Sequence, residues 1–118
     1  METLNVEKQA HVCIIRFAGE LTLEVVDKLK QEIQQHLQDP EASVLVIDLS
    51  QTVFLDSSGI GFLVHLNNRK KSFSKELYLL KPSPQVKKTL SLVKLLNHFN
   101  VIDDESGLQA LLDSPPSG

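Results

Sequence analysis

The chain has 118 residues, a single cysteine and a formal net charge of −3. This length predicts one domain with one core. The mild acidity gives no support to a nucleic-acid-binding role, and no apolar run approaches the ~20 residues needed to cross a bilayer. Cys13 alone excludes an internal disulfide, and residues 1–5 lack the pattern of a signal peptide. We therefore expect a cytoplasmic protein in which Cys13 is buried.

The first half of the chain predicts a pair of strands, a helix and a buried strand. Apolar residues over 4–17 indicate two strands joined near residues 8–10. Residues 24–38 place their apolar side chains on one helical face, and Pro40 follows the end of that helix. Residues 44–47 are continuously apolar, which is typical of a strand covered on both faces.

The next helix is expected over residues 57–71, and it carries more apolar side chains than one buried face needs. These form two stripes: Ile60, Leu63 and Val64, and, offset from them, Phe62 and Leu66. A helix resting on a sheet requires only one such stripe. The second stripe is therefore either further core beneath a neighbouring helix or an exposed contact patch.

The remaining pattern continues the alternation of strands and helices. We expect a strand over 77–80, a helix from Pro84, a weak strand over 99–102 and a final helix capped by residues 103–106. The inward residues of the helix from Pro84 are expected to be Val86, Leu90 and Val93. The pattern predicts an α/β domain over residues 1–112, with a mixed, largely parallel sheet, an added N-terminal strand and a flexible tail over 113–118.

Residues 56–61, Asp-Ser-Ser-Gly-Ile-Gly, stand where the apolar segment 53–55 meets the helix expected over 57–71. Free N–H groups and the positive dipole end stabilise an anion at a helix start. Gly59 and Gly61 each cost a helix roughly 1 kcal/mol relative to alanine, but they leave room for another protein to approach. The motif is thus either a serine displayed for phosphorylation or an ordinary N-cap, and the spacing alone favours the cap.

No arrangement of side chains in the sequence predicts catalysis. Neither serine has the flanking glycines of a nucleophile elbow. His65 lies about 10 Å along the helix from Ser58, at 1.5 Å per residue, which is too far for a base. The other histidines lack metal-ligand spacing, and no phosphate-binding loop is present. We therefore expect no enzyme activity, no metal and no cofactor.

The segment over 46–61 resembles the signature of bacterial anti-sigma factor antagonists, the stand-alone STAS domains. It reads Val-Ile-Asp-Leu-Ser, then Phe-Leu, then the serine motif. The resemblance extends to residues 17–21, Phe-Ala-Gly-Glu-Leu, and to residues 79–90, and it covers nearly the whole chain from Leu4 to Leu112. It implies a STAS-type fold with about four helices.

The resemblance also implies a function by partner switching. The unphosphorylated protein would bind an anti-sigma factor that is also a serine kinase, and would thereby release a sigma factor for transcription. Phosphorylation of Ser58, with Ser57 as the alternative, would end that binding, and a serine phosphatase would restore it. No nucleic-acid or membrane partner is expected. The residues expected to contact the partner are Thr22, Asp56, Ser57, Ser58, Gly59, Ile60, Gly61 and Phe62.

One residue departs from the family pattern. Thr22 follows residues 19–21 where many members carry an acid, and it could cap the first helix with Glu24 in its first turn. An acid that a kinase could recognise is therefore missing at this position.

The alternative function is a STAS interaction or scaffold module of a signalling or transport complex that does not switch by phosphorylation.

Overall fold

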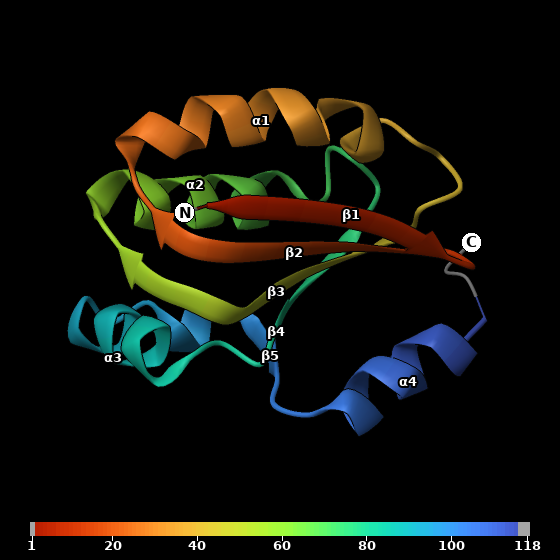
Figure 1. Cartoon of the computed structure of the whole chain (residues 1–118). Helices are drawn as coiled ribbons and strands as arrows, with labels where there is room; N and C mark the ends of the chain where they lie inside the picture. Colours follow the sequence, from red (N-terminus) through yellow and green to blue (C-terminus); the bar gives the residue numbers. More distant parts are fainter. Residues whose placement is uncertain (1, 116–118) are drawn as a thin grey trace.

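The computed structural model describes residues 2–115, within which five strands and four α-helices alternate (Figure 1). The strands are β1 (Thr3–Gln9), β2 (Val12–Leu21), β3 (Val44–Leu55), β4 (Glu76–Leu80) and β5 (Asn100–Ile102). The helices are α1 (Leu23–Leu37), α2 (Ser57–Arg69), α3 (Pro84–Leu92) and α4 (Glu105–Asp113), with a short 3₁₀ helix, η1 (Leu96–His98), before β5.

The strands form one sheet in the order β1-β2-β3-β4-β5. β1 is antiparallel to β2, to which it is joined by a tight turn, whereas β2, β3, β4 and β5 are mutually parallel. The connections between the parallel strands are helical, as parallel pairing requires. The predicted α/β class, the added N-terminal strand and the four helices are confirmed.

Strand side chains alternate between two cores, one on each face of the sheet. On β2, Cys13, Ile15 and Phe17 belong to the larger core, which the sheet forms with α1, α2 and α3. Val12 and Ile14 belong to the smaller core, which includes Leu108 of α4. Figure 1 shows α1 and α2 together above the sheet and α4 apart from them. The thiol of Cys13 is buried as expected, and burial raises its pKa.

β3 is much longer than the strand expected over 44–47. β4 pairs with β3 only as far as the Asp48–Leu80 pair, so more than half of β3, residues 49–55, pairs with β2 alone. This extension carries the chain beyond β4 and delivers it to the start of α2. The extension therefore places the serine motif at one end of the sheet.

For the apolar side chains, one expectation is wrong and one open alternative is decided. Val93 does not point into the core: it is the C-cap residue of α3, lies beyond the last helical turn and is 47% exposed. Phe62 and Leu66 are each only 4% exposed, because α1 lies beside α2 and covers that flank. They are core residues, as is Leu63, whereas Ile60 and Val64 are only partly buried.

The C-terminal end of the chain continues the fold as far as Asp113, the last residue of α4. The expected tail over 113–118 thus begins within that helix, and its residues 116–118 lie outside the described part of the chain. Within residues 2–115, none of the helices combines the length and hydropathy required to span a membrane.

Candidate functional site

Asp56 joins the starts of two helices. It lies between β3 and α2 as the N-cap of α2, and its Oδ1 accepts the Gly59 N–H at 2.9 Å. Its Oδ2 accepts the N–H of Leu23, the first residue of α1, at 3.0 Å. Its own N–H donates to the Leu21 carbonyl at 3.3 Å. One carboxylate therefore satisfies free N–H groups of both helices and fixes their spacing.

The charge of Asp56 is stabilised by these contacts. The Gly59 N–H, followed by the N–H groups of Leu23 and Ser58, holds the pKa of the carboxyl below its ordinary value of 3.8. Negative charge is favoured at a helix start, and here it faces two starts. The carboxylate is thus ionised at neutral pH and acts as a permanent cap.

Ser57 and Ser58 occupy the first turn of α2, directly after the cap. Because Asp56 supplies the capping side chain, neither serine hydroxyl is needed for that role. Ser57 is exposed and Ser58 is partly buried. Of the two interpretations of the motif, the N-cap belongs to Asp56, and the serines are left as polar groups at a helix start, where an added anion is stabilised.

The two glycines of the motif have different environments. A Cβ placed on Gly59 would collide with the backbone carbonyl oxygen of Leu21 and would lie 3.1 Å from its Cγ. Gly59 therefore permits the close contact between α2 and the end of β2. A Cβ placed on Gly61 would meet nothing within 4 Å, and this glycine is exposed. Packing within the described chain requires the first glycine but gives no reason for the second.

Thr22 occupies the N-cap position of α1 as expected, but its side chain makes no capping hydrogen bond. Its hydroxyl donates to the Glu24 carboxylate at 3.2 Å, while the Leu23 N–H is satisfied by Asp56. The sequence could not show this arrangement, because Asp56 lies 33 residues after Leu23. Thr22 nevertheless lies within one residue of the Asp56 contact, next to the serine motif.

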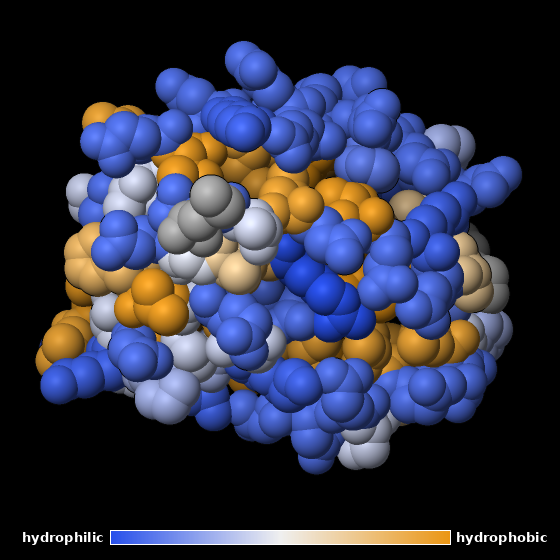
Figure 2. All heavy atoms as spheres, in the orientation of Figure 1, coloured by the Kyte–Doolittle hydropathy of each residue, from blue (hydrophilic) through white to orange (hydrophobic). Residues whose placement is uncertain are grey.

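Three large apolar side chains near Asp56 are exposed, and the sequence interpretation missed all three. Leu23 is 62%, Val53 53% and Phe54 48% exposed. Leu23 is hydrogen-bonded to Asp56, and the other two precede it on the extension of β3. Figure 2 shows hydrophobic atoms at the left end of the molecule, over the end of β3. The sequence signal that could have revealed an apolar surface here is that residues 53–55 are all apolar. Only the structure shows that β4 is too short to cover this part of β3.

The structure does not place Phe62 on this surface. The phenyl ring borders a small void between α1, α2 and the sheet, together with Leu29 and Ile33 of α1. The buried Phe62 ring is therefore not available to a partner, contrary to the prediction that it is a partner contact. Ile60 is only partly accessible. The structure brings the other expected residues together around the start of α2: Thr22, Asp56, Ser57, Ser58, Gly59 and Gly61.

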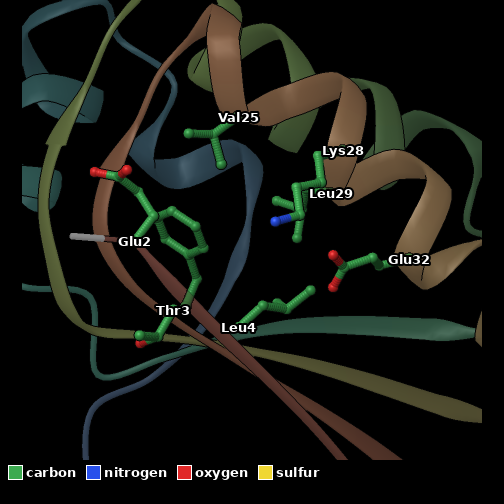
Figure 3. A pocket seen from close by; sticks show the side chains of 8 residues that line it. Glu2, Thr3, Leu4, Val25, Lys28, Leu29 and Glu32 are labelled. Atoms are coloured by element: carbon green, nitrogen blue, oxygen red, sulfur yellow. The ribbon is translucent and has the colours of Figure 1, made fainter.

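A separate hollow lies between β1 and α1. Figure 3 shows Leu4 of β1 and Lys28 and Glu32 of α1 around the same opening, which measures about 190 Å³. That volume is below the range usual for small-molecule sites. None of the residues of the serine motif lines it. Among residues 2–115, no cluster of three or more acidic, histidine or cysteine side chains could hold a metal ion.

A family model and a curated relative both match most of this chain. The STAS domain family model matches residues 3–110. The anti-sigma F factor antagonist of Paenibacillus polymyxa is 25% identical over 104 residues, which cover 86% of this chain and 89% of that protein.

Solved structures share the fold. An anti-sigma factor antagonist from Mycobacterium paratuberculosis has a TM-score of 0.81 at 24% identity and covers 96% of each chain. The Bacillus cell fate determinant SpoIIAA in its phosphorylated form has a TM-score of 0.70 at 20% identity, over 92% of this chain and 99% of that one. Since the family model spans nearly all of the described residues, the chain belongs to the STAS domain family.

Proposed function

We propose that this protein is an anti-sigma factor antagonist that is switched by phosphorylation of Ser58. The observation that carries the proposal is the division of roles at the start of α2. Asp56 caps the helix, and Ser58 follows in the first turn without a capping task. The relatives named above as anti-sigma factor antagonists support the same function.

The partner would be an anti-sigma factor with serine kinase activity, bound in the cytoplasm at the surface around the start of α2. This surface would combine the open side of Gly61 with the exposed apolar residues Leu23, Val53 and Phe54. Exposed apolar groups surrounded by polar ones are typical of interaction sites. The protein would act by binding and not by catalysis, and transcription would be regulated through the sigma factor that is released.

Phosphate on Ser58 would weaken binding without unfolding the domain. It adds about −1.5 to −2 charge at pH 7 and three strong acceptors. The start of α2 stabilises that charge within the domain. At the centre of an interface the same charge must be desolvated, and the bulk of the phosphate must be accommodated.

Thr22 stands where many family members carry an acid. The first turn of α1 therefore has Glu24 as its only acidic side chain.

The test begins with capture of the cognate kinase on the purified protein, followed by incubation with ATP and Mg²⁺ and mapping of the phosphate by mass spectrometry. We expect phosphate on Ser58. Ser58→Ala should abolish the modification and retain affinity, and Ser57→Ala is the matched control that should retain both. A serine phosphatase from the same cells should remove the phosphate.

Two results would contradict the proposal. Phosphate confined to Ser57 would move the switch to the neighbouring residue. A bound partner together with no phosphate on either serine would instead favour a STAS interaction module that does not switch.

A further inference from the structure

A second groove lies along the flank that α1 and α2 share, away from Asp56. The two helices run side by side on the same face of the sheet (Figure 1). The groove measures about 250 Å³ and is called here the α1–α2 groove. It is lined by Lys30, Ile33, Gln34 and Leu37 of α1, by Phe62, His65, Leu66 and Arg69 of α2, and by Phe73.

The floor of the α1–α2 groove is apolar and its rim is cationic. Phe62 and Leu66 lie at the bottom of the groove and are each only 4% exposed, so that a ligand would reach only their edges. Lys30 and Arg69 stand exposed on the rim. The Arg69 guanidinium lies 5.7 Å from the centre of the Phe73 ring, which holds it at one end of the groove. Neither cation forms a salt bridge with any residue between 2 and 115.

The rim of the groove is positively charged, whereas the whole chain is negatively charged. The protein has a formal net charge of −3, yet no acidic residue of the described chain lines the groove. Two unpaired cations beside an apolar floor complement a ligand with apolar groups at its centre and carboxylates at its edges. The volume is below that of a typical drug-sized site and suits a few inserted side chains.

The groove also continues the surface of the serine motif. α2 begins at Ser57, and its outward side passes from the open position at Gly61 to His65 on the groove. The seven residues from Ser58 to His65 span about 10 Å along the helix axis. A partner that covers the start of α2 can therefore reach the groove with a neighbouring segment.

We propose that the α1–α2 groove binds an acidic amphipathic helix of the partner protein, with its apolar side chains on the floor and its carboxylates facing Lys30 and Arg69. This inference rests on the proposed function and extends it. Helix-in-groove recognition uses such apolar anchors at helical spacing. The groove contact holds the partner independently of Ser58, so that phosphorylation weakens only one of two contact regions.

The first test needs no kinase. The probe is a fluorescent helical peptide of about 18 residues, long enough to form a helix, with leucines on one face and glutamates on its flanks. A matched peptide carries lysines in place of the glutamates. We expect the glutamate peptide to bind at least about tenfold more tightly in fluorescence anisotropy, and more weakly as salt is raised.

Charge reversal locates the binding. Arg69→Glu and Lys30→Glu should each weaken binding of the glutamate peptide about fivefold or more, because attraction is replaced by repulsion. Lys88→Glu is the matched control: it makes the same change in net charge at an exposed position of α3 and should leave affinity unchanged. Circular dichroism of each variant verifies that it is folded.

The same variants are then measured with the purified anti-sigma factor and unphosphorylated protein. A fivefold loss with Arg69→Glu but not with Lys88→Glu supports the partner assignment. Equal binding of the two peptides, or unchanged partner affinity in both groove variants, overturns it. Binding of dodecanoate in the groove without binding of the glutamate peptide also overturns it in favour of an anionic amphiphile. Failure of Ser58 phosphorylation leaves the peptide result intact, so the two proposals fail separately.

Discussion

The two glycines at the start of α2 should respond to alanine with opposite changes in stability. Helix propensity alone favours either Gly→Ala change by about 1 kcal/mol. At Gly61 nothing opposes this gain, because an added Cβ meets no atom within 4 Å. The melting temperature of Gly61→Ala should therefore rise by about 3–6 °C for a domain of this size.

At Gly59 the added methyl group meets the Leu21 carbonyl oxygen, which belongs to the backbone of β2 and cannot rotate away. Overpacking costs about 1–3 kcal/mol, and a rigid backbone neighbour places this site at the upper end of the range. After the gain in propensity, Gly59→Ala should lose about 1–2 kcal/mol. Thermal unfolding followed by circular dichroism compares both variants with the unchanged protein. A lower melting temperature for Gly61→Ala, or a higher one for Gly59→Ala, would refute this assignment of roles.

Three further predictions concern the surface and the cap. Phe62→Ala should lower the free energy of unfolding in urea by about 3–5 kcal/mol, because the ring is in the core. Phe54→Ala should leave that free energy nearly unchanged but weaken binding to the anti-sigma factor, as measured by calorimetry. The reverse pattern would exchange the roles of the two residues. Gly61→Ala should weaken binding of that partner although it stabilises the domain, and unchanged affinity would show that no close approach occurs there. Asp56→Asn should be less stable than the unchanged protein at pH 7. Because the folded pKa of Asp56 is lowered, this stabilisation is present above 3.8 and is lost as pH falls through the folded value, so the difference between the two proteins should close in acid; a constant difference across that range would contradict it.

Local patterns in the sequence were sufficient for the order of elements and for the serine motif. Helical spacing over 24–38 and the continuous apolar run over 44–47 report burial directly, and α1 and the first part of β3 follow from them. The position of residues 56–61 between a strand and a helix is equally local. These features depend on neighbours in the chain, which a sequence displays.

Features that depend on distant residues could not be predicted. The exposure of Phe54 follows from the early end of β4, and the burial of Phe62 follows from the position of α1. The bond from Leu23 to Asp56 joins residues 33 positions apart. The different environments of Gly59 and Gly61 likewise become visible only when β2 lies against α2.

In the proposed switch, phosphate on Ser58 weakens binding to the anti-sigma factor. The most direct measurement compares the affinity of unphosphorylated and stoichiometrically phosphorylated protein for the purified partner, with melting temperatures taken on the same samples. We expect a large loss of affinity with nearly unchanged melting temperature, because a helix start stabilises an added anion within the domain. Equal affinity of the two forms, both folded, would contradict the switch.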